Sequence, residues 1–219
     1  MFAELSRWVR GFGGQRVAER NQTQRWIMLD VETTGLDPRA DQLLAIAAIA
    51  LCFSPATGRL DVAIGDSFEI VLRQDKPSGK ENILIHHIGI QAQSEGSVPE
   101  EGLELFRNWA GNAPLLAFHA AFDQVMIERA FRRFHLAPLG NEWLDIEPIV
   151  RLLGGNTKAH ALDDWLTHFG IECAVRHQAA SDAFATAELL MRLWPTIHKE
   201  ANSWSQLRKL ARSAAWIPH

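Results

Sequence analysis

The chain has 219 residues, of which 47% are hydrophobic and 22% are charged, so it holds enough apolar material for one sizeable core. This composition excludes a disordered chain, a collagen and a disulfide-rich scaffold. A formal net charge of -4 gives no chain-wide positive field for a long nucleic-acid duplex, although the end of a strand could still be bound locally.

The first 25 residues are rich in arginine and predict a basic, helical N-terminal extension. A transit peptide is the alternative. A secretory signal is not expected, because the segment lacks the long apolar stretch that such a signal contains. No repeat or low-complexity linker divides the rest. We therefore expect one catalytic domain over 26–195 and a C-terminal helical extension over 196–219. We expect that extension to dock through Trp204 and Trp216, and the alternative is a grip on nucleic acid or a partner.

Three strands are predicted in succession. The apolar run 26–31 ends at the Thr34-Gly35 turn, and 43–53 has no polar face, as is typical of a buried central strand. The third segment, 66–72, alternates between apolar and polar residues. Together these segments predict a meander.

Helices and a further strand follow. Helical spacing is present over 98–109, 122–134, 144–153, 161–169 and 178–193, and 114–118 predicts a short buried strand. On the last helix we expect Ala180, Phe184, Ala187 and Met191 to form the inner stripe. The pattern predicts an α/β fold, with a mixed sheet and helices on both faces.

The cellular setting follows from the apolar runs and the cysteines. The longest apolar run, 43–53, is well short of the roughly 20 residues that a membrane-spanning helix needs, so no membrane association is expected. Cys52 and Cys173 form no CxxC pair, which favours a reducing compartment. We therefore expect a cytoplasmic protein.

Four acids stand at the ends of predicted elements. Asp30 and Glu32 occupy alternate positions at the end of the first strand, so their side chains point to the same face of the sheet. Asp123 is near the start of one predicted helix and Asp182 near the start of the last. An unpaired carboxylate at Asp30, inside an apolar run, would be costly, so a positive partner is expected.

Converging carboxylates repel each other unless cations neutralise them, and ligands that offer only oxygen favour Mg²⁺ or Mn²⁺. Two such ions about 3.5 to 4 Å apart can activate a water and stabilise a leaving 3′ oxygen, which is the chemistry of phosphodiester hydrolysis. His177 precedes Asp182 closely, and histidine as a residue type suits a general base near neutral pH.

Three separated motifs carry a family resemblance. They are Asp30-Val-Glu32-Thr33-Thr34-Gly35, His119-Ala-Ala-Phe122-Asp123 and His177-Gln-Ala-Ala-Ser-Asp182, and they span roughly 26–193. The chain resembles the DEDDh-type 3′-5′ exonucleases, which include the proofreading subunits of bacterial replicative DNA polymerases. The resemblance implies a ribonuclease-H-like fold with a mixed five-stranded sheet. It also implies metal ligands at Asp30, Glu32, Asp123 and Asp182, and a general base at His177.

The sister subclass of this family replaces the histidine by a tyrosine, and this chain has no tyrosine. The resemblance also places Thr33, Thr34, Gly35 and Leu36 against the terminal nucleotide. His87 and Phe122 are further candidates for substrate contact, with a surface histidine and a packing phenylalanine as the alternatives. Ala120 departs from the family, which usually has an asparagine there, so a polar contact is missing unless His119 or Gln124 replaces it.

The resulting expectation is a 3′-5′ exonuclease that uses two Mg²⁺ or Mn²⁺ ions to release nucleoside 5′-monophosphates from single-stranded or frayed DNA ends. One alternative is an RNA-trimming exoribonuclease of the same family, since no residue reports a contact to a 2′-hydroxyl. The other is a weakly catalytic subunit that mainly binds a polymerase or another partner. The intact set of four acids and a histidine argues against a dead scaffold.

Overall fold

The structure is a computed structural model that describes residues 23–155 and 159–216. The predicted N-terminal extension lies outside the described residues except at its end, where β1 begins at Gln24. Arg25, next on that strand, forms an ion pair with Asp66 at 2.7 Å and stacks on the ring of Trp109.

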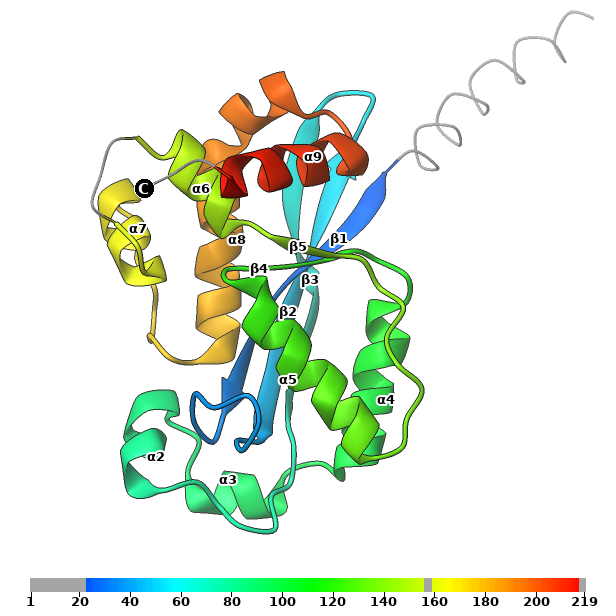
Figure 1. The fold of residues 1–219 in the computed structure, drawn as a ribbon, viewed down its shortest axis with the longest axis vertical. Coiled ribbons are helices and arrows are strands. Elements are labelled where there is room, and N and C mark those ends of the chain that lie inside the picture. The colour runs from blue at the N-terminus through cyan, green and yellow to red at the C-terminus, as the bar shows by residue number, and fades with distance from the viewer. Residues whose placement is uncertain (1–22, 156–158, 217–219) are drawn as a thin grey trace, which may run out of the picture.

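One mixed sheet holds all five strands that the described residues form, in the order β3-β2-β1-β4-β5 (Figure 1). The three long strands β1 (Gln24–Thr33), β2 (Leu43–Ser54) and β3 (Arg59–Val71) are antiparallel neighbours. The short strands β4 (Leu115–Ala117) and β5 (Trp143–Asp145) run parallel to β1. The sequence-based prediction of a mixed five-stranded sheet is confirmed.

Eight helices surround the sheet in the described part of the chain. They are α2 (Lys80–His86), α3 (Ile90–Glu95), α4 (Pro99–Ala110), α5 (Ala120–Arg133), α6 (Glu147–Leu153), α7 (Leu162–Phe169), α8 (Ala179–Glu200) and α9 (Trp204–Ala215). Within the same ranges, no helix is long and apolar enough to cross a membrane.

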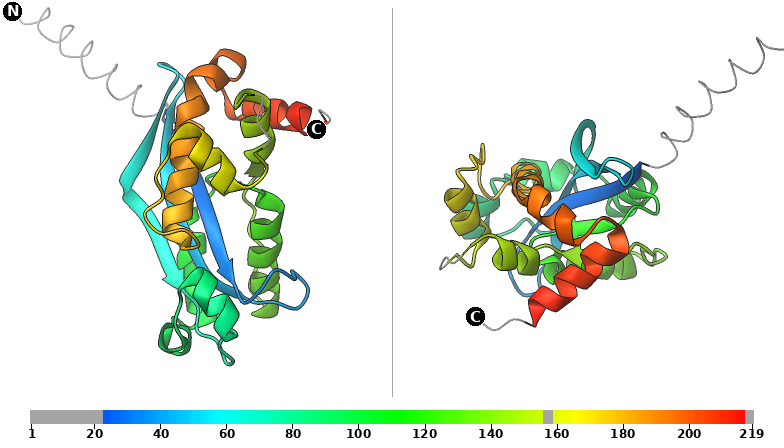
Figure 2. Two further views of the ribbon diagram at one scale, coloured as in Figure 1. Left: turned by 90° about the vertical axis from the view of Figure 1, so that its left-hand side faces the viewer. Right: turned by 90° about the horizontal axis from the view of Figure 1, so that it is seen from above.

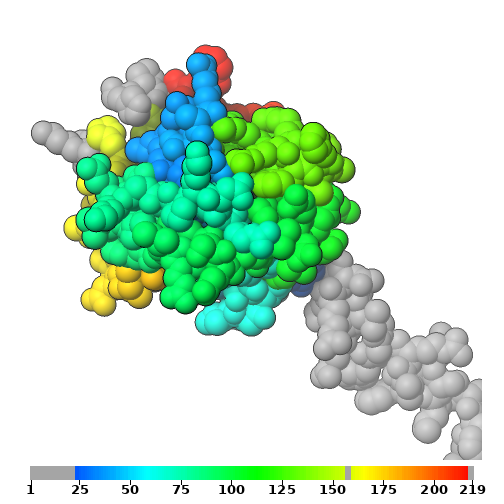
Figure 3. Space-filling model, turned by 90° about the horizontal axis from the view of Figure 1, so that it is seen from below, coloured from blue at the N-terminus to red at the C-terminus, as the bar shows by residue number. Residues whose placement is uncertain are grey.

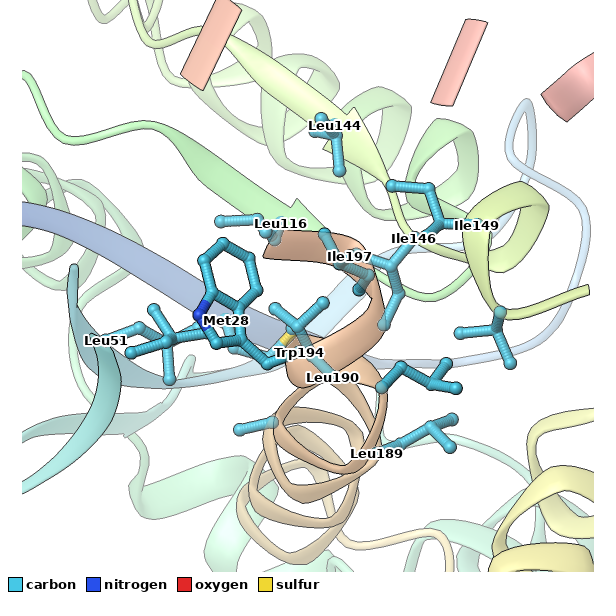
Figure 4. Packing of buried hydrophobic residues seen from close by; sticks show 14 of the residues in the cluster. Met28, Leu51, Leu116, Leu144, Ile146, Ile149, Leu189, Leu190, Trp194 and Ile197 are labelled. Carbon is cyan, nitrogen blue, oxygen red and sulfur yellow. The ribbon is translucent and has the colours of Figure 1, made fainter. Parts of the chain in front are cut away.

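Strand β1 is buried on both faces, which explains its continuous apolar sequence. Trp26 and Met28 face a cluster built from α6, α7, α8 and α9, where Met28 lies near Leu190 and Trp194 (Figure 4). Ile27, Leu29 and Val31 face a second cluster built from α4 and α5. Figure 2 shows β1 between α8 and α5 in the side view.

This alternation positions the acids. Asp30 and Glu32 continue the series of Trp26 and Met28, so they point to the face of the sheet that α8 covers. The start of α8 supplies Asp182 on that face. The side-chain period of the strand thus brings together acids that are far apart in the sequence.

Two predicted elements differ from the structure, and two short helices were not predicted. The segment 144–153 is not one helix, because Leu144 lies in β5 opposite Leu116, and α6 begins only at Glu147, followed by a proline that favours a helix start. Strand β3 begins at Arg59, well before 66, and a register shift opposite Ile49 interrupts its alternation. The short helices α2 and α3 were not predicted, since most of their residues are exposed and give no apolar stripe.

The two C-terminal helices also differ from the prediction, in the inner stripe of α8 and in the docking of the C-terminal extension. The inner stripe of α8 runs through Ala183, Ala187, Leu190 and Trp194, whereas Phe184 is 43% exposed. The helix continues through Pro195 to Glu200. Helix α9 packs on α6 through Leu207, Ala211 and Ala214, with Trp204 partly buried against the same cluster. Trp216 is 87% exposed, so the expected docking through its ring is wrong.

Candidate active site

Three carboxylates meet at the end of β1. One oxygen each from Asp30, Glu32 and Asp182 lies within 4.8 Å of the other two. Asp30 and Glu32 are half-buried, and Asp182 is only 5% exposed. The structure therefore assembles three of the four predicted metal ligands in one group.

The fourth acid, Asp123, lies outside that group but is coupled to it electrostatically. Its helix α5 begins after His119, which adopts the left-handed conformation with a φ of 61°. The backbone N–H of His119 donates to Oδ1 of Asp145 at 2.9 Å, which fixes the turn between β4 and the helix. Asp123 is 4% exposed, and the negative charge of Asp30 contributes to its raised pKa.

Burial and mutual repulsion perturb the acids strongly. Burial, followed by the charge of Asp182, raises the pKa of Asp30 to about 8. Burial, followed by the charges of Asp30 and Asp182, raises the pKa of Glu32 to about 9. The pKa of Asp123 is raised well above its ordinary value, again chiefly by burial.

A cluster of this kind is short of positive charge, and a divalent cation would restore the ionised forms. Its donors are all carboxylate oxygens, which suit Mg²⁺ or Mn²⁺ better than soft metals. The residues present therefore fit a divalent metal site.

One cation of the chain does reach the cluster, and sequence reasoning missed it. The guanidinium of Arg176 donates through Nη1 to Oδ1 of Asp182 and through Nε to Oδ1 of Asp163 on α7. Its charge lowers the pKa values of Asp30 and Glu32, although less than burial raises them. Among the described contacts Arg176 bonds Asp182 rather than Asp30, so the positive partner expected at Asp30 stays a prediction.

His177 lies on the turn that enters α8. Its φ is 59°, its side chain is exposed, and its backbone N–H donates to Oδ2 of Asp182 at 3.0 Å. The main chain of His177 is thus anchored to a proposed metal ligand, while the imidazole remains open to solvent.

The residues that follow Glu32 form a loop with its tip in solvent. Leu36 is 87% exposed, as a residue that contacts a ligand rather than the core would be. Thr34 donates from Oγ1 to Oδ1 of Asp41 at 2.9 Å. A Cβ on Gly35 would lie 2.5 Å from Oδ2 of Asp41, so any larger residue here would displace that carboxylate.

The remaining candidates occupy different surroundings. Phe122 is half-buried and packs on the α5 side of the core, as the packing alternative expects. His87 is exposed at the end of α2, whereas its neighbour His86 is buried and bonds Ser78 at 3.0 Å. Contact of His87 with a substrate stays a prediction.

The position of the missing asparagine is apolar in this chain. Ala120 is 3% exposed and belongs to the apolar cluster that α5 shares with β1. Gln124, a suggested replacement for the lost polar contact, donates instead to Glu128 at 2.8 Å. The ring of His119 lies against Phe118, with 4.7 Å between the ring centroids.

Comparison with known proteins gives related sequences and folds. The DNA polymerase III PolC-type protein of Staphylococcus haemolyticus is 27% identical over 184 residues, which are 81% of this chain and 12% of that protein. The corresponding protein of Staphylococcus epidermidis is 26% identical over 168 residues, which are 77% of this chain and 11% of that protein. The chain therefore spans only a small part of the length of these relatives.

Solved structures show the same fold. Escherichia coli exonuclease I in complex with a dT13 oligonucleotide superposes with a TM-score of 0.65 at 20% identity, over 80% of this chain and 43% of that one. Exonuclease X in complex with 5′ overhanging duplex DNA gives 0.62 at 19% identity, over 85% of this chain and 99% of that one. The mixed sheet is thus that of the ribonuclease-H-like exonucleases.

The model of the RNase T family, described as exonuclease, matches residues 27–190, a range that contains every proposed ligand and the histidine. Because this match covers well over half of the chain, the protein belongs to that exonuclease family and is a nuclease of the DEDDh type.

Proposed function

We propose that the protein is a 3′-5′ exonuclease that hydrolyses single-stranded or frayed DNA ends to nucleoside 5′-monophosphates. The observation that carries this proposal is the cluster of Asp30, Glu32 and Asp182, whose oxygens lie within 4.8 Å of one another. His177 lies on the turn before α8, and its backbone N–H is bonded to Asp182 of this cluster.

Each residue has a part in this chemistry. Asp30, Glu32, Asp123 and Asp182 would hold two Mg²⁺ or Mn²⁺ ions. When bound, such ions polarise a phosphodiester, activate the attacking water and stabilise the leaving oxygen. The imidazole of His177 accepts the proton of the attacking water. Thr33, Thr34, Gly35 and Leu36 bind the terminal nucleotide, with the exposed Leu36 side chain against its base.

DNA is the favoured substrate because of the proteins that this chain resembles. The PolC-type relatives are DNA polymerases, and the similar folds of exonuclease I and exonuclease X carry DNA in their structures. A polymerase partner is a second proposal, since the matching part of the relatives belongs to a polymerase. We also propose a cytoplasmic location, because both cysteines are free.

A time course on 5′-labelled single-stranded DNA and RNA of the same sequence tests the activity. With Mg²⁺ or Mn²⁺ we expect a ladder that shortens from the 3′ end of the DNA, and no products with EDTA. Asp30→Asn is the matched inactive control, because it keeps the shape of the side chain but loses a proposed ligand. Faster shortening of the RNA would assign the exoribonuclease alternative, and an intact substrate with both metals would contradict the proposal.

A further inference from the structure

The loop 34–42 carries Leu36 at an exposed position, so the apolar core does not fix where this side chain stands. The backbone closes the loop at its base, where Thr34 N donates to Gln42 O at 2.9 Å. The N–H of Gln42 returns a bond to Oγ1 of Thr34 at 2.9 Å. In the view from below, the blue surface of the loop stands beside the green surface of α2 and α3 (Figure 3).

Asp41 holds the loop from inside. Its Oδ1 accepts from the hydroxyl of Thr34 at 2.9 Å, and its Oδ2 accepts from the N–H of Asp37 at 2.8 Å. The same carboxylate fills the space next to Gly35, where a Cβ would lie 2.5 Å from it. One carboxylate therefore contacts the chain on both sides of Leu36.

Arg129 holds the loop from outside. This half-buried residue of α5 donates from Nη1 to the carbonyl oxygen of Pro38 at 2.6 Å and to that of Asp41 at 2.8 Å. The same helix carries Asp123, a proposed metal ligand. On the opposite side, Asn82 of α2 donates to the carbonyl oxygen of Thr34. Arg129 thus fixes the loop to α5, the helix that also carries the proposed ligand Asp123.

We propose that Asp41 and Arg129 are positioning residues for the terminal nucleotide of the substrate, and this inference rests on the proposed function. They contact the loop rather than the reacting atoms, and they hold Leu36 and the backbone of 34–36 at a fixed place relative to the carboxylates. The rate of hydrolysis depends steeply on how the substrate is placed, since a displacement of about 1 Å can cost about 10²-fold in rate. We call the contacts of Asp41 and Arg129 with this loop the brace. Removing the brace should lower turnover while the metal ligands remain in place.

A double-mutant cycle between Arg129→Met and Leu36→Ala tests the inference. Methionine keeps the apolar stem of Arg129 but has no donor for the two carbonyl oxygens. We expect each single variant to lower kcat/KM, by about 10²-fold for Arg129→Met. The double variant should be no slower than Arg129→Met alone, because Leu36 is already out of place. Effects that simply add would overturn the inference.

Two further variants separate positioning from loss of fold. Arg129→Lys retains a donor and should recover part of the lost kcat/KM, whereas an equally slow lysine variant would count against the bonds to Pro38 and Asp41. Asp41→Asn removes the charge while keeping the shape, and it provides a second cycle with Leu36→Ala if Arg129→Met does not fold. Arg132→Met is the matched control, since Arg132 lies on the same helix and pairs with Glu128 at 3.8 Å.

Metal binding gives a readout that is independent of turnover. Mn²⁺ titrated into Arg129→Met should bind with the affinity of the wild type, because no proposed ligand has changed. Weakened Mn²⁺ binding would show that the brace supports the metal site instead, and would overturn the inference. A wild-type protein that binds Mn²⁺ but cuts no DNA or RNA would contradict the proposed function, whereas additive variants of an active enzyme contradict only the inference.

Discussion

Arg176 donates from its guanidinium to Oδ1 of Asp182, and it donates to Asp163 from the same side chain. Asp182 is one of three acids whose oxygens form the group at the end of β1. A cation of the protein itself is therefore bonded to a residue that we propose as a metal ligand. It provides part of the positive charge that the cluster requires.

This relationship predicts how Arg176 affects metal affinity. The side chain repels an incoming divalent ion and occupies one oxygen of Asp182, so Arg176→Gln should bind Mn²⁺ several-fold more tightly than the wild type. Titration calorimetry with Mn²⁺ measures the change. Arg192→Gln on α8 is the matched control, because Arg192 pairs only with Glu188 on the helix surface in the described contacts. Unchanged or weaker binding in Arg176→Gln would refute a competition between the two cations.

The raised pKa values predict that the metal-free protein is less stable at high pH. Asp30 and Glu32 have pKa values of about 8 and about 9 in the folded state, against ordinary values of 3.8 and 4.5. Between these limits the folded state binds more protons than the unfolded state, so the free energy of unfolding falls as the pH rises. Thermal unfolding in EDTA from pH 5 to pH 9 should show a falling Tm.

Asp30→Asn should flatten that slope, and saturating Mg²⁺ should raise Tm most at the high end of the range. A Tm that is independent of pH in EDTA would contradict the electrostatic account of the cluster. Metal-independent melting at high pH would contradict the metal site itself.

Substitution of Asp30 and substitution of Asp182 should change the stability of the metal-free protein differently, although both should abolish hydrolysis. Asp30→Asn relieves repulsion in a site where burial and Asp182 raise the pKa, so the metal-free protein should gain stability near neutral pH. Asp182→Asn removes the charge that pairs with Arg176, and hydrogen bonds to charged groups contribute about 1.5 to 3 kcal/mol. Urea unfolding in EDTA should therefore show a gain for Asp30→Asn and none for Asp182→Asn. Near-normal activity in either variant would exclude that acid as a ligand.

Sequence patterns predicted the central strands and the convergence of Asp30, Glu32 and Asp182. Continuous apolar runs predicted β1 and β2, and alternation along β1 placed Asp30 and Glu32 on one face. Arg176 was missed because a contact with Asp182 depends on how the turn before α8 folds, and the spacing of residues does not report this. The bonds of Arg129 to the loop were missed for a related reason. Their acceptors are backbone oxygens, which every residue has, so no residue type in the sequence indicates them.

Short elements were harder to predict than long ones. Strand β5 has only three residues and merges into the helical pattern of 144–153, so its apolar residues fit either assignment. Helices α2 and α3 are exposed on most sides and depend on contacts such as that of Asn82 with the loop 34–42. In both cases tertiary contacts decide between local alternatives.

The general base can be tested with a substitution that fits the backbone. His177 has a φ of 59°, a conformation that asparagine tolerates better than alanine. His177→Asn should keep the backbone bond to Asp182 and the affinity for Mn²⁺, and lower turnover by about 10² to 10⁴-fold. The measurement is single-turnover hydrolysis at saturating metal. An unchanged rate would assign the proton to another group.

The proposed position of Leu36 predicts a requirement for a free, unpaired 3′ end. Its side chain is 87% exposed on the loop that follows Glu32 at the end of β1, and a net charge of -4 leaves only a local grip on the strand. A 3′-phosphorylated strand should therefore resist hydrolysis, because its last nucleotide does not fit between Leu36 and the acids. A circular strand offers no end and should resist completely.

A perfectly paired blunt duplex should be cut more slowly than one with a terminal mismatch, because its end must first fray at a cost of a few kcal/mol. Product ladders on linear, circular, 3′-blocked and duplex substrates, at matched metal and salt, measure all four cases. Leu36→Ala should lose more activity on the paired end than on the mismatched one, since a side chain that wedges beside the last base helps to open it. Rapid internal cleavage of the circle would show an endonuclease, and the exonuclease mechanism proposed for this site would then be wrong.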